Sequence, residues 1–161
     1  MWTPAEIRTH LVDMGVTHVT GVPDSTFGPW FDELRTSSEI RLVPVCREGE
    51  AWGVAAGLHL GGAIPLVLIQ CTGLFESGDA LRNMLYDLGL PLYAIIGYRN
   101  YLNRAAASDS TLRFTEPILQ AWAIDYVLIE SPDQIGRLKD HHRNSRRDAV
   151  PGVALVAEGR G

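Results

Sequence analysis

The stretch VCREGEAWGVAAGLHLGGAIPLVLIQ, residues 45–70, places a helix-like segment between two apolar runs. Its middle part, residues 48–60, has the composition of a closely packed helix, and IPLVLIQ (64–70) is apolar at nearly every position. An apolar run without alternation is typical of a strand that is covered on both faces, as in a parallel sheet. The stretch therefore predicts a helix that leads into an interior strand.

The same alternation of helix and apolar strand extends to both ends of the chain. The first helix has a capping-box pattern, with Thr3 as N-cap, Pro4 at the first helical position and Glu6 two residues later. The predicted helices cover residues 3–15, 27–37, 48–60, 78–89, 116–123 and 132–144, and the predicted strands cover 18–22, 40–45, 64–70, 91–98, 125–129 and 152–157. This order indicates an α/β fold with a doubly wound, mostly parallel sheet and helices on both faces.

Two local expectations concern the segments after the third and fourth strands. In the predicted helix 78–89, Leu81, Leu85 and Leu88 are spaced for one buried stripe, and Ser77 is expected to be the N-cap. Residues 70–78 are accordingly expected to form a loop. A polar loop is also predicted from Arg99 to about Arg113.

Composition and charge limit the classes of protein to consider. A chain of 161 residues with 46% apolar residues is predicted to form one domain over residues 1–161. Its net charge of −5 offers no basic face for nucleic acid. Cys46 and Cys71 form no zinc or CxxC pattern, and no signal-peptide pattern opens the chain, so a cytoplasmic location is expected. Glycine, proline and polar residues interrupt the apolar stretch 53–75, so no membrane span is expected.

The candidate functional residues lie in the loops that follow strands. A doubly wound sheet binds ligands beyond the carboxyl ends of its strands, and parallel strands bring these ends to one edge. The loops concerned are GVPDSTF (21–27), CREGE (46–50), QCTGLFESG (70–78) and GYRNYLNR (97–104). We expect all four to open on the same edge.

Glu48 stands at the point where a strand ends and a helix begins. A lone acid there is most simply explained as a complement to the helix dipole. Gly49, Gly53 and Gly57 follow at a spacing of four, so one face of the helix carries no side chains at these positions. Such a face permits the close approach of a backbone or a flat ligand. Glu50 lies about 200° around the helix from Glu48 and is expected to be solvated or at an interface.

The remaining polar candidates have both a structural and a functional interpretation. Asp24 and Ser25 follow a strand and are as readily helix caps as substrate contacts. Arg99 and Asn100 come directly after another strand. The planar guanidinium of Arg99 suits a carboxylate, sulfonate or phosphonate, although a surface arginine is the commoner explanation.

Four motifs together resemble one enzyme family. GVPDSTF, CREGEAWGVAAGLHLGG, VLIQCTGLFESGDALRNM and LPLYAIIGYRN occur in this order and resemble the pyrimidine-binding domain of thiamine-diphosphate-dependent 2-oxoacid decarboxylases. The likeness is strongest to the alpha subunits of sulfopyruvate decarboxylase and to phosphonopyruvate decarboxylases, and it covers roughly residues 3–130.

The resemblance implies roles for individual residues. Glu48 matches the glutamate that hydrogen-bonds N1′ of the cofactor's aminopyrimidine ring and activates it. By the same likeness, Thr72, Gly73 and Leu74 line the aminopyrimidine pocket, and Asp24, Ser25, Arg99 and Asn100 face the substrate. Many members carry a His-His pair after the fourth strand, where this chain has YRNYLNR (98–104). This difference favours a 2-oxo acid with an anionic group on C3.

The resemblance also implies a partner. The family holds Mg²⁺ and the cofactor's diphosphate with a GDG motif and a later asparagine on a second domain, and this chain has no such motif. We therefore expect no metal ligands in this chain. A diphosphate-binding beta subunit is expected to hold the Mg²⁺ of bound thiamine diphosphate, in a heterotetramer or larger complex with equal numbers of the two subunits.

Two alternatives remain open at this point. One keeps thiamine diphosphate but makes the enzyme a carboligase that forms carbon–carbon bonds. The other is a non-catalytic, flavodoxin-like binding module in which Glu48 is only a helix-terminal acid. Such a module would gain nothing from thiamine diphosphate or from a partner.

Overall fold

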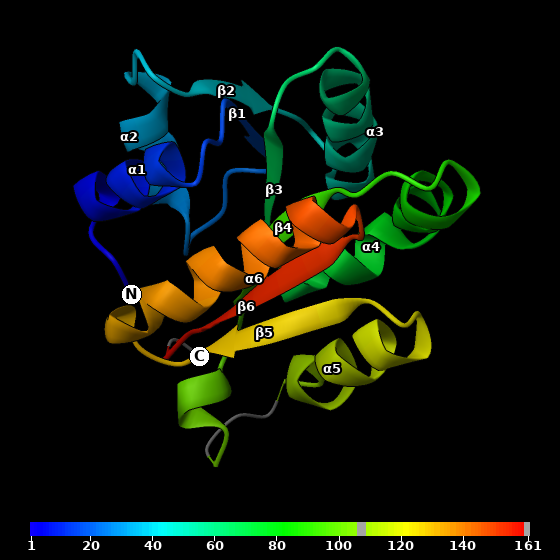
Figure 1. Cartoon of the computed structure of the whole chain (residues 1–161). Helices are drawn as coiled ribbons and strands as arrows, with labels where there is room; N and C mark the ends of the chain where they lie inside the picture. Colours follow the sequence, from blue (N-terminus) through cyan, green and yellow to red (C-terminus); the bar gives the residue numbers. More distant parts are fainter. Residues whose placement is uncertain (106–108, 160–161) are drawn as a thin grey trace.

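The computed structural model describes residues 1–105 and 109–159 and contains a six-stranded, all-parallel sheet (Figure 1). The strand order is β2-β1-β3-β4-β6-β5. The strands are β1 (His18–Gly21), β2 (Arg41–Pro44), β3 (Pro65–Gln70), β4 (Tyr93–Tyr98), β5 (Asp125–Ile129) and β6 (Gly152–Ala157). The predicted fold class is confirmed, and five of the six strands agree with the sequence to within a residue at each end; β4 begins two residues later than predicted.

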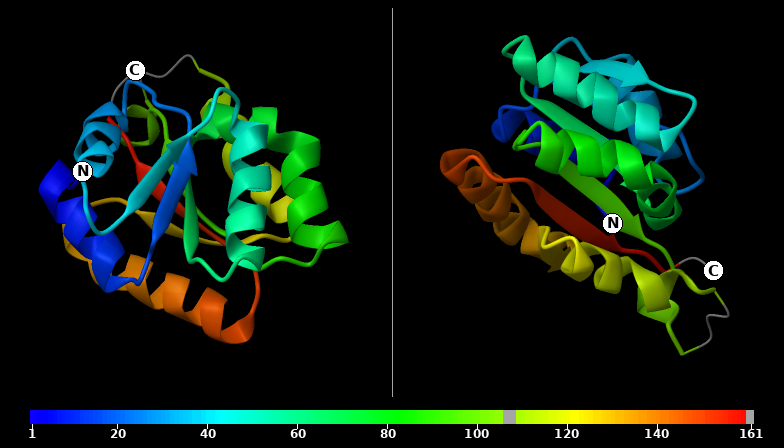
Figure 2. Two further views of the ribbon diagram at one scale, coloured as in Figure 1. Left: turned by 90° about the horizontal axis from the view of Figure 1, so that it is seen from above. Right: turned by 90° about the vertical axis from the view of Figure 1, so that its right-hand side faces the viewer.

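Helices cover both faces of this sheet (Figure 2). The α-helices are α1 (Pro4–Asp13), α2 (Gly28–Arg35), α3 (Glu48–Leu60), α4 (Cys71–Arg82), α5 (Thr111–Ala121) and α6 (Ile135–Asp148). Shorter turns are η1 (Asn83–Asp87), η2 (Tyr101–Asn103) and η3 (Pro132–Gln134). Apolar residues of α1, α2 and α6 form one core, and those of α3, α4 and α5 form the other. The sheet is thus an apolar layer between two helical layers.

The direction of winding reverses between β1 and β3. From β1 the chain passes through α2 to the edge strand β2, and it then crosses through α3 to β3 on the other side of β1. Such a reversal leaves a crevice at the carboxyl ends of the two strands, because the connections leave the sheet in opposite directions. The carboxyl ends of β1 and β3, at Gly21 and Gln70, are therefore where a fold of this class is expected to bind a ligand.

The helix after β3 differs from the prediction. Helix α4 begins at Cys71, where a loop was expected, because Cys71, Leu74 and Phe75 recur at helical spacing and pack against the core. The backbone leaves the helical conformation at Gly78, where the helix was expected to start. The predicted buried stripe is wrong at Leu88, which is 57% exposed beyond the π-helical turn η1.

Other differences are small. The capping box of α1 is confirmed, since the Thr3 backbone N–H donates to the Glu6 carboxylate at 2.8 Å. Helix α5 begins at Thr111, five residues before the predicted start, and so shortens the polar loop expected over 99–113. Residues 106–108 of that loop lie outside the described part of the chain. Within residues 1–105 and 109–159, no helix combines the length and apolar character needed to cross a bilayer.

Gly21 lies at a close approach between β1 and β3. A Cβ atom built on Gly21 would overlap the backbone carbonyl of Leu68 and would lie 3.3 Å from Cζ of Phe31. The carbonyl belongs to the interior strand β3 and cannot rotate away as a flexible side chain can. Glycine at this position therefore permits the two strands to pair up to the crevice.

We predict that Gly21→Ala lowers the free energy of unfolding by about 1–3 kcal/mol, because the added methyl group overpacks two paired strands. Urea denaturation of the purified chain measures this loss. Gly53→Ala is the control, since Gly53 is exposed in α3 with nothing within 4 Å of an added Cβ. Alanine there should be neutral or stabilise by about 0.5–1 kcal/mol. Equal midpoints for Gly21→Ala and the wild type would contradict the close approach.

Candidate functional site

The four predicted loops all lie at the carboxyl edge of the sheet. They follow β2, β1, β3 and β4, which are consecutive neighbours in the strand order. Glu48 starts α3 after β2, Asp24 follows β1, Thr72 follows β3, and Arg99 follows β4. The parallel arrangement thus collects residues that are far apart in the sequence along one edge.

The side chain of Glu48 lies against Gly73. A Cβ atom built on Gly73 would meet Cγ of Glu48 at 2.5 Å and Oε1 at 2.9 Å. Gly73 is buried in the first turn of α4, and Glu48 is half-buried at the first residue of α3. Only glycine leaves space for the carboxyl group at this position. Gly73, the first glycine of QCTGLFESG, therefore makes room for the Glu48 side chain.

Two sets of hydrogen bonds hold α3 against α4 around this contact. At the surface, Glu76 accepts from the Arg47 guanidinium at 2.6 and 2.9 Å and from the Gly49 backbone N–H at 2.8 Å. In the interior, the Trp52 indole N–H donates to Oγ of Ser77 at 2.9 Å. Oγ of Ser77 in turn donates to the Gly73 carbonyl oxygen at 2.6 Å. These hydrogen bonds of Glu76 and Ser77, which we call the clamp between α3 and α4, fix the start of α3 relative to Gly73 of α4.

The predicted role of Ser77 as an N-cap is wrong. Helix α4 begins six residues before Ser77, so Ser77 lies inside the helix and cannot cap its start. Its side chain is 1% exposed and accepts the hydrogen bond from the Trp52 indole. Glu76 stabilises the first turn of α3 rather than that of its own helix. Its hydrogen bonds and the Arg47 guanidinium hold the pKa of the Glu76 carboxyl below its usual range.

The two glutamates at the start of α3 are used differently. The Glu50 carboxylate accepts from the backbone N–H groups of Cys46 and Arg47 at 3.1 and 3.2 Å, so it closes a capping box. The Glu48 carboxylate makes no hydrogen bond or ion pair with any residue in the described ranges 1–105 and 109–159. Glu48 is thus the acid at this helix end that is available to a ligand.

The other predicted cofactor contacts occupy different environments. Thr72 is exposed beside Gly73, whereas Leu74 is fully buried in the core beneath α3 and α4. Gly53 and Gly57 are exposed, and no atom lies within 4 Å of a Cβ added to either. Gly49 differs, because its added Cβ would contact Ala80 of α4 at 3.4 Å.

Asp24 shapes its own loop. Its carboxylate accepts from the backbone N–H groups of Thr26 and Phe27, both at 2.7 Å, in the turn before α2. Burial raises the pKa of the Asp24 carboxyl, and these hydrogen bonds oppose the rise. Ser25 is exposed at the tip of the same turn.

A polar network that the sequence did not predict joins this loop to the sheet. Thr26 Oγ1 donates to the Glu158 carboxylate at 2.8 Å and accepts from the Gln70 amide at 2.8 Å. Glu158 follows β6 and is 3% exposed, and its carboxyl lies over Gly97, where a side chain would overlap it. An acid directly after the apolar run 152–157 was the available signal. The network ties the ends of β3 and β6 to the loop after β1.

Arg99 and Asn100 close the edge after β4. Nε of Arg99 lies 3.4 Å from the Asp109 carboxylate, and 43% of the arginine side chain is exposed. Asn100 adopts a left-handed conformation with φ 62°, which asparagine tolerates in turns. Its Oδ1 is buried without a hydrogen-bond donor among the described residues. Such an atom is commonly satisfied by a bound molecule or water.

The comparisons with known proteins identify the family. Residues 5–115 match the family model described as "Thiamine pyrophosphate enzyme, N-terminal TPP binding domain". The chain belongs to this family. The match spans β1 to β4 and the start of α5, so it contains all the candidate residues described above except Glu158.

Similar curated proteins agree with this assignment. The sulfopyruvate decarboxylase subunit alpha of Methanococcus maripaludis is 30% identical over 129 residues, which are 80% of this chain and 77% of that protein. The sulfopyruvate decarboxylase subunit alpha of Methanothermobacter thermautotrophicus is 29% identical over 133 residues, which are 80% of this chain and 81% of that protein. The phosphonopyruvate decarboxylase of Streptomyces viridochromogenes is 34% identical over 95 residues, but these make up only 24% of that longer protein.

The site fits the aminopyrimidine part of the family's cofactor, thiamine diphosphate. A ring nitrogen of that cofactor needs a carboxyl without another partner, and the Glu48 carboxyl, for which Gly73 leaves space, meets this requirement among the described residues. The predicted family and cofactor are confirmed by the match to the family model. Within the described residues, no three His, Cys, Asp or Glu side chains are grouped as metal ligands.

We predict that Ser77→Ala lowers the free energy of unfolding by about 1–3 kcal/mol, because it leaves the buried Trp52 N–H without an acceptor. Urea denaturation of the isolated chain is the measurement. Ser38→Ala is the matched control, since Ser38 is exposed in the turn before β2. A loss no larger than that of the control would contradict the proposed support of α3 by α4.

Proposed function

We propose that this chain is the pyrimidine-binding subunit of a two-chain, thiamine-diphosphate-dependent decarboxylase of 2-oxo acids with an anionic C3 substituent, such as sulfopyruvate or phosphonopyruvate. The observation that carries the proposal is the half-buried Glu48 carboxylate, which lies against Gly73 and has no protein partner among the described residues. The names of the similar proteins support the reaction type.

Glu48 acts as the acid and base toward the cofactor's ring nitrogen in this proposal. A carboxyl oxygen beside N1′ can donate a proton to that nitrogen and take it back, provided that no other group occupies the oxygen. The clamp between α3 and α4 restricts where the carboxyl can lie. When bound, thiamine diphosphate supplies the electron sink that decarboxylation of a 2-oxo acid needs.

Thr72, Gly73 and Leu74 have separate tasks in the proposed cofactor pocket. Gly73 leaves space for the Glu48 carboxyl, and exposed Thr72 borders the ring. Leu74 anchors this turn of α4 in the core, so its contribution is to hold the wall in place. The three residues together form the part of the pocket wall that adjoins Glu48.

The substrate is proposed to lie along the ends of β1 and β4. An anionic group on C3 would compete with Asp109 for the exposed guanidinium of Arg99. The Asn100 amide adds a second polar group on the same turn. Asp24 and Ser25 border the site from the loop after β1, and the Thr26 network fixes that loop.

The proposal includes a partner subunit that holds the diphosphate and Mg²⁺. The word "alpha" in the names of similar proteins implies a second subunit for those enzymes. For this chain we propose equal numbers of the two subunits, with the active site between them. We also propose a cytoplasmic location, with Cys46 and Cys71 as free thiols.

The test is co-expression of this chain with a candidate diphosphate-binding beta subunit. Carbon dioxide release is followed from sulfopyruvate, phosphonopyruvate and pyruvate in the presence of Mg²⁺ and thiamine diphosphate. We predict that Glu48→Gln lowers kcat by about a hundredfold or more, the usual effect of losing an acid–base group. Gly73→Ala should act in the same direction, because its methyl group displaces the carboxyl.

Glu50→Gln is the control, because glutamine at this position preserves the capping box. It should retain nearly the wild-type rate. Equal turnover of Glu48→Gln and the wild type would contradict the acid–base role. A ligated product without net aldehyde formation would favour a carboligase, and absence of both cofactor binding and partner binding would favour a non-catalytic module.

A further inference from the structure

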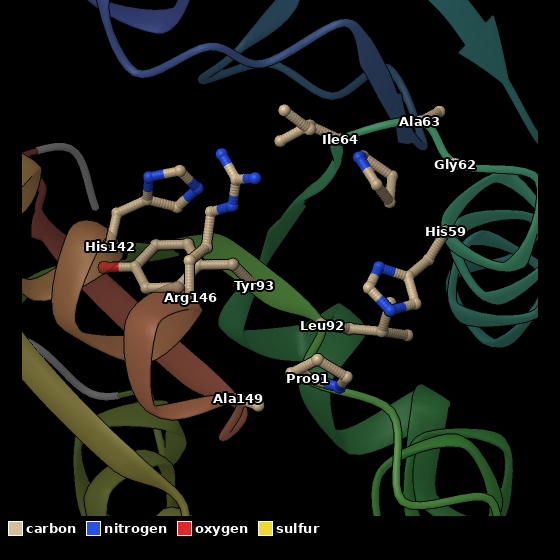
Figure 3. Close-up of a pocket in the computed structure, with 11 residues that line it drawn as sticks. His59, Gly62, Ala63, Ile64, Pro91, Leu92, Tyr93, His142, Arg146 and Ala149 are labelled. Atoms are coloured by element: carbon tan, nitrogen blue, oxygen red, sulfur yellow. The ribbon is translucent and has the colours of Figure 1, made fainter.

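A cavity of about 470 Å³ lies at the amino edge of the sheet, opposite the edge that carries Glu48. It is bordered by the end of α3, the starts of β3 and β4, and the last turns of α6 (Figure 3). Glu48 and His59 are eleven positions apart on α3. At a rise of about 1.5 Å per residue, the two ends are separated by about 17 Å along the helix. The cavity is therefore separate from the thiamine site.

The lining of this cavity is positive and polar on two sides. Figure 3 shows His142 and Arg146 of α6 on one side and His59 of α3 on the other. The Arg146 guanidinium makes no hydrogen bond or ion pair with another residue in the described part of the chain. No aspartate or glutamate is among the described residues that line the cavity. Arg146 thus supplies a cation without a counter-charge at its rim.

His142 supplies a neutral donor. Its side chain is 3% exposed and packs edge-on against the ring of Tyr93, with the ring centroids 4.9 Å apart. Burial, the Arg146 charge and His141 lower the pKa of His142 to about 4. The imidazole is therefore uncharged near neutral pH and can donate one hydrogen bond. His59 lies across the cavity as a second imidazole.

The rest of the wall is apolar. Ile64, Pro65, Pro91 and Leu92 line the cavity together with the aromatic ring of Tyr93. The Tyr93 hydroxyl is already engaged with Nδ1 of His141 at 2.7 Å. A ligand that fills this space would thus contact one guanidinium, two imidazoles and a mostly apolar surface.

We propose that this cavity binds a small organic monocarboxylate with a compact apolar body. The carboxylate pairs with the planar guanidinium of Arg146, which matches two oxygens at once, and accepts from the imidazoles. The apolar body packs between Tyr93, Leu92 and Ile64. The volume lies within the range of about 300–1,000 Å³ that is typical of small-molecule sites.

The helix termini favour a single negative charge over a double one. Helices α3 and α6 both end at this edge, and the carbonyl ends of helices repel anions. One arginine can offset this field for a monoanion. A phosphate dianion is usually bound by several N–H donors at a helix N-terminus, and neither helix presents that end to this cavity.

The test is a titration of the ¹⁵N-labelled full chain with benzoate, followed by amide chemical shifts. We expect saturable shifts at Ala63, Leu92 and Ala149, with little change at Thr72. Arg146→Gln should weaken benzoate binding by about tenfold or more, as expected for losing a charge-assisted pair. Arg143→Gln is the matched control, since Arg143 is exposed on α6, pairs with Asp140 and does not line the cavity.

The control variant should bind benzoate within about twofold of the wild type, and inorganic phosphate should bind more weakly than benzoate. The proposal is overturned if benzoate gives no saturable shifts at the cavity, or if Arg146→Gln and Arg143→Gln bind equally. Phosphate binding at least as tight as benzoate would overturn the assigned ligand class. None of these outcomes depends on the partner subunit or on the thiamine site.

Discussion

The contact of the Glu48 carboxyl with Gly73 governs the arrangement of the candidate site at the carboxyl edge of the sheet. It requires α4 to begin directly at the end of β3, so that a glycine in its first turn faces the first residue of α3. It also requires the two helices to keep their spacing, which Ser77 secures from the interior and Glu76 from the surface. The carboxyl is held by backbone geometry rather than by a hydrogen-bond partner. Holding it this way leaves its oxygens available.

Most of the fold was predictable because the sequence of each strand is a distinct, mainly apolar run. Continuous apolar runs such as residues 64–70 are distinct from the amphipathic helices between them, and Thr3 and Glu6 mark a helix start. The start of α4 was not predicted, since Thr72, Gly73 and Gly78 suggest a loop and the packing of Leu74 against α3 overrides that preference. Local composition indicates a turn here, but the burial of Leu74 in the tertiary structure stabilises a helix instead.

The candidate site was predictable only in part, for a related reason. Glu48 is marked by its place between a strand and a glycine-rich helix. The Thr26, Gln70 and Glu158 network joins residues up to 132 positions apart, and it depends on the strand order that brings β6 near the loop after β1. Such a pairing has no local pattern. The cavity near Arg146 was missed similarly, because its wall comes from the ends of four separate elements, α3, β3, β4 and α6.

The two edges of the sheet carry different ionisable groups, the Glu48 carboxyl at one and the Arg146 guanidinium at the other. Helix α3 begins at the carboxyl edge with Glu48, and it ends at the amino edge beside the cavity that Arg146 of α6 lines. One helix thus carries Glu48 at one end and His59 at the other. The alternation of strands and helices that builds the sheet also separates the two regions in space.

The central claim is most directly tested by a crystal structure of this chain with its partner subunit, thiamine diphosphate and Mg²⁺. The account predicts an oxygen of Glu48 within hydrogen-bond distance of N1′, about 2.6–3.0 Å, with the Glu48 side chain still packed against Gly73. A structure in which another carboxylate contacts N1′, or in which Glu48 faces away from the ring, would contradict it.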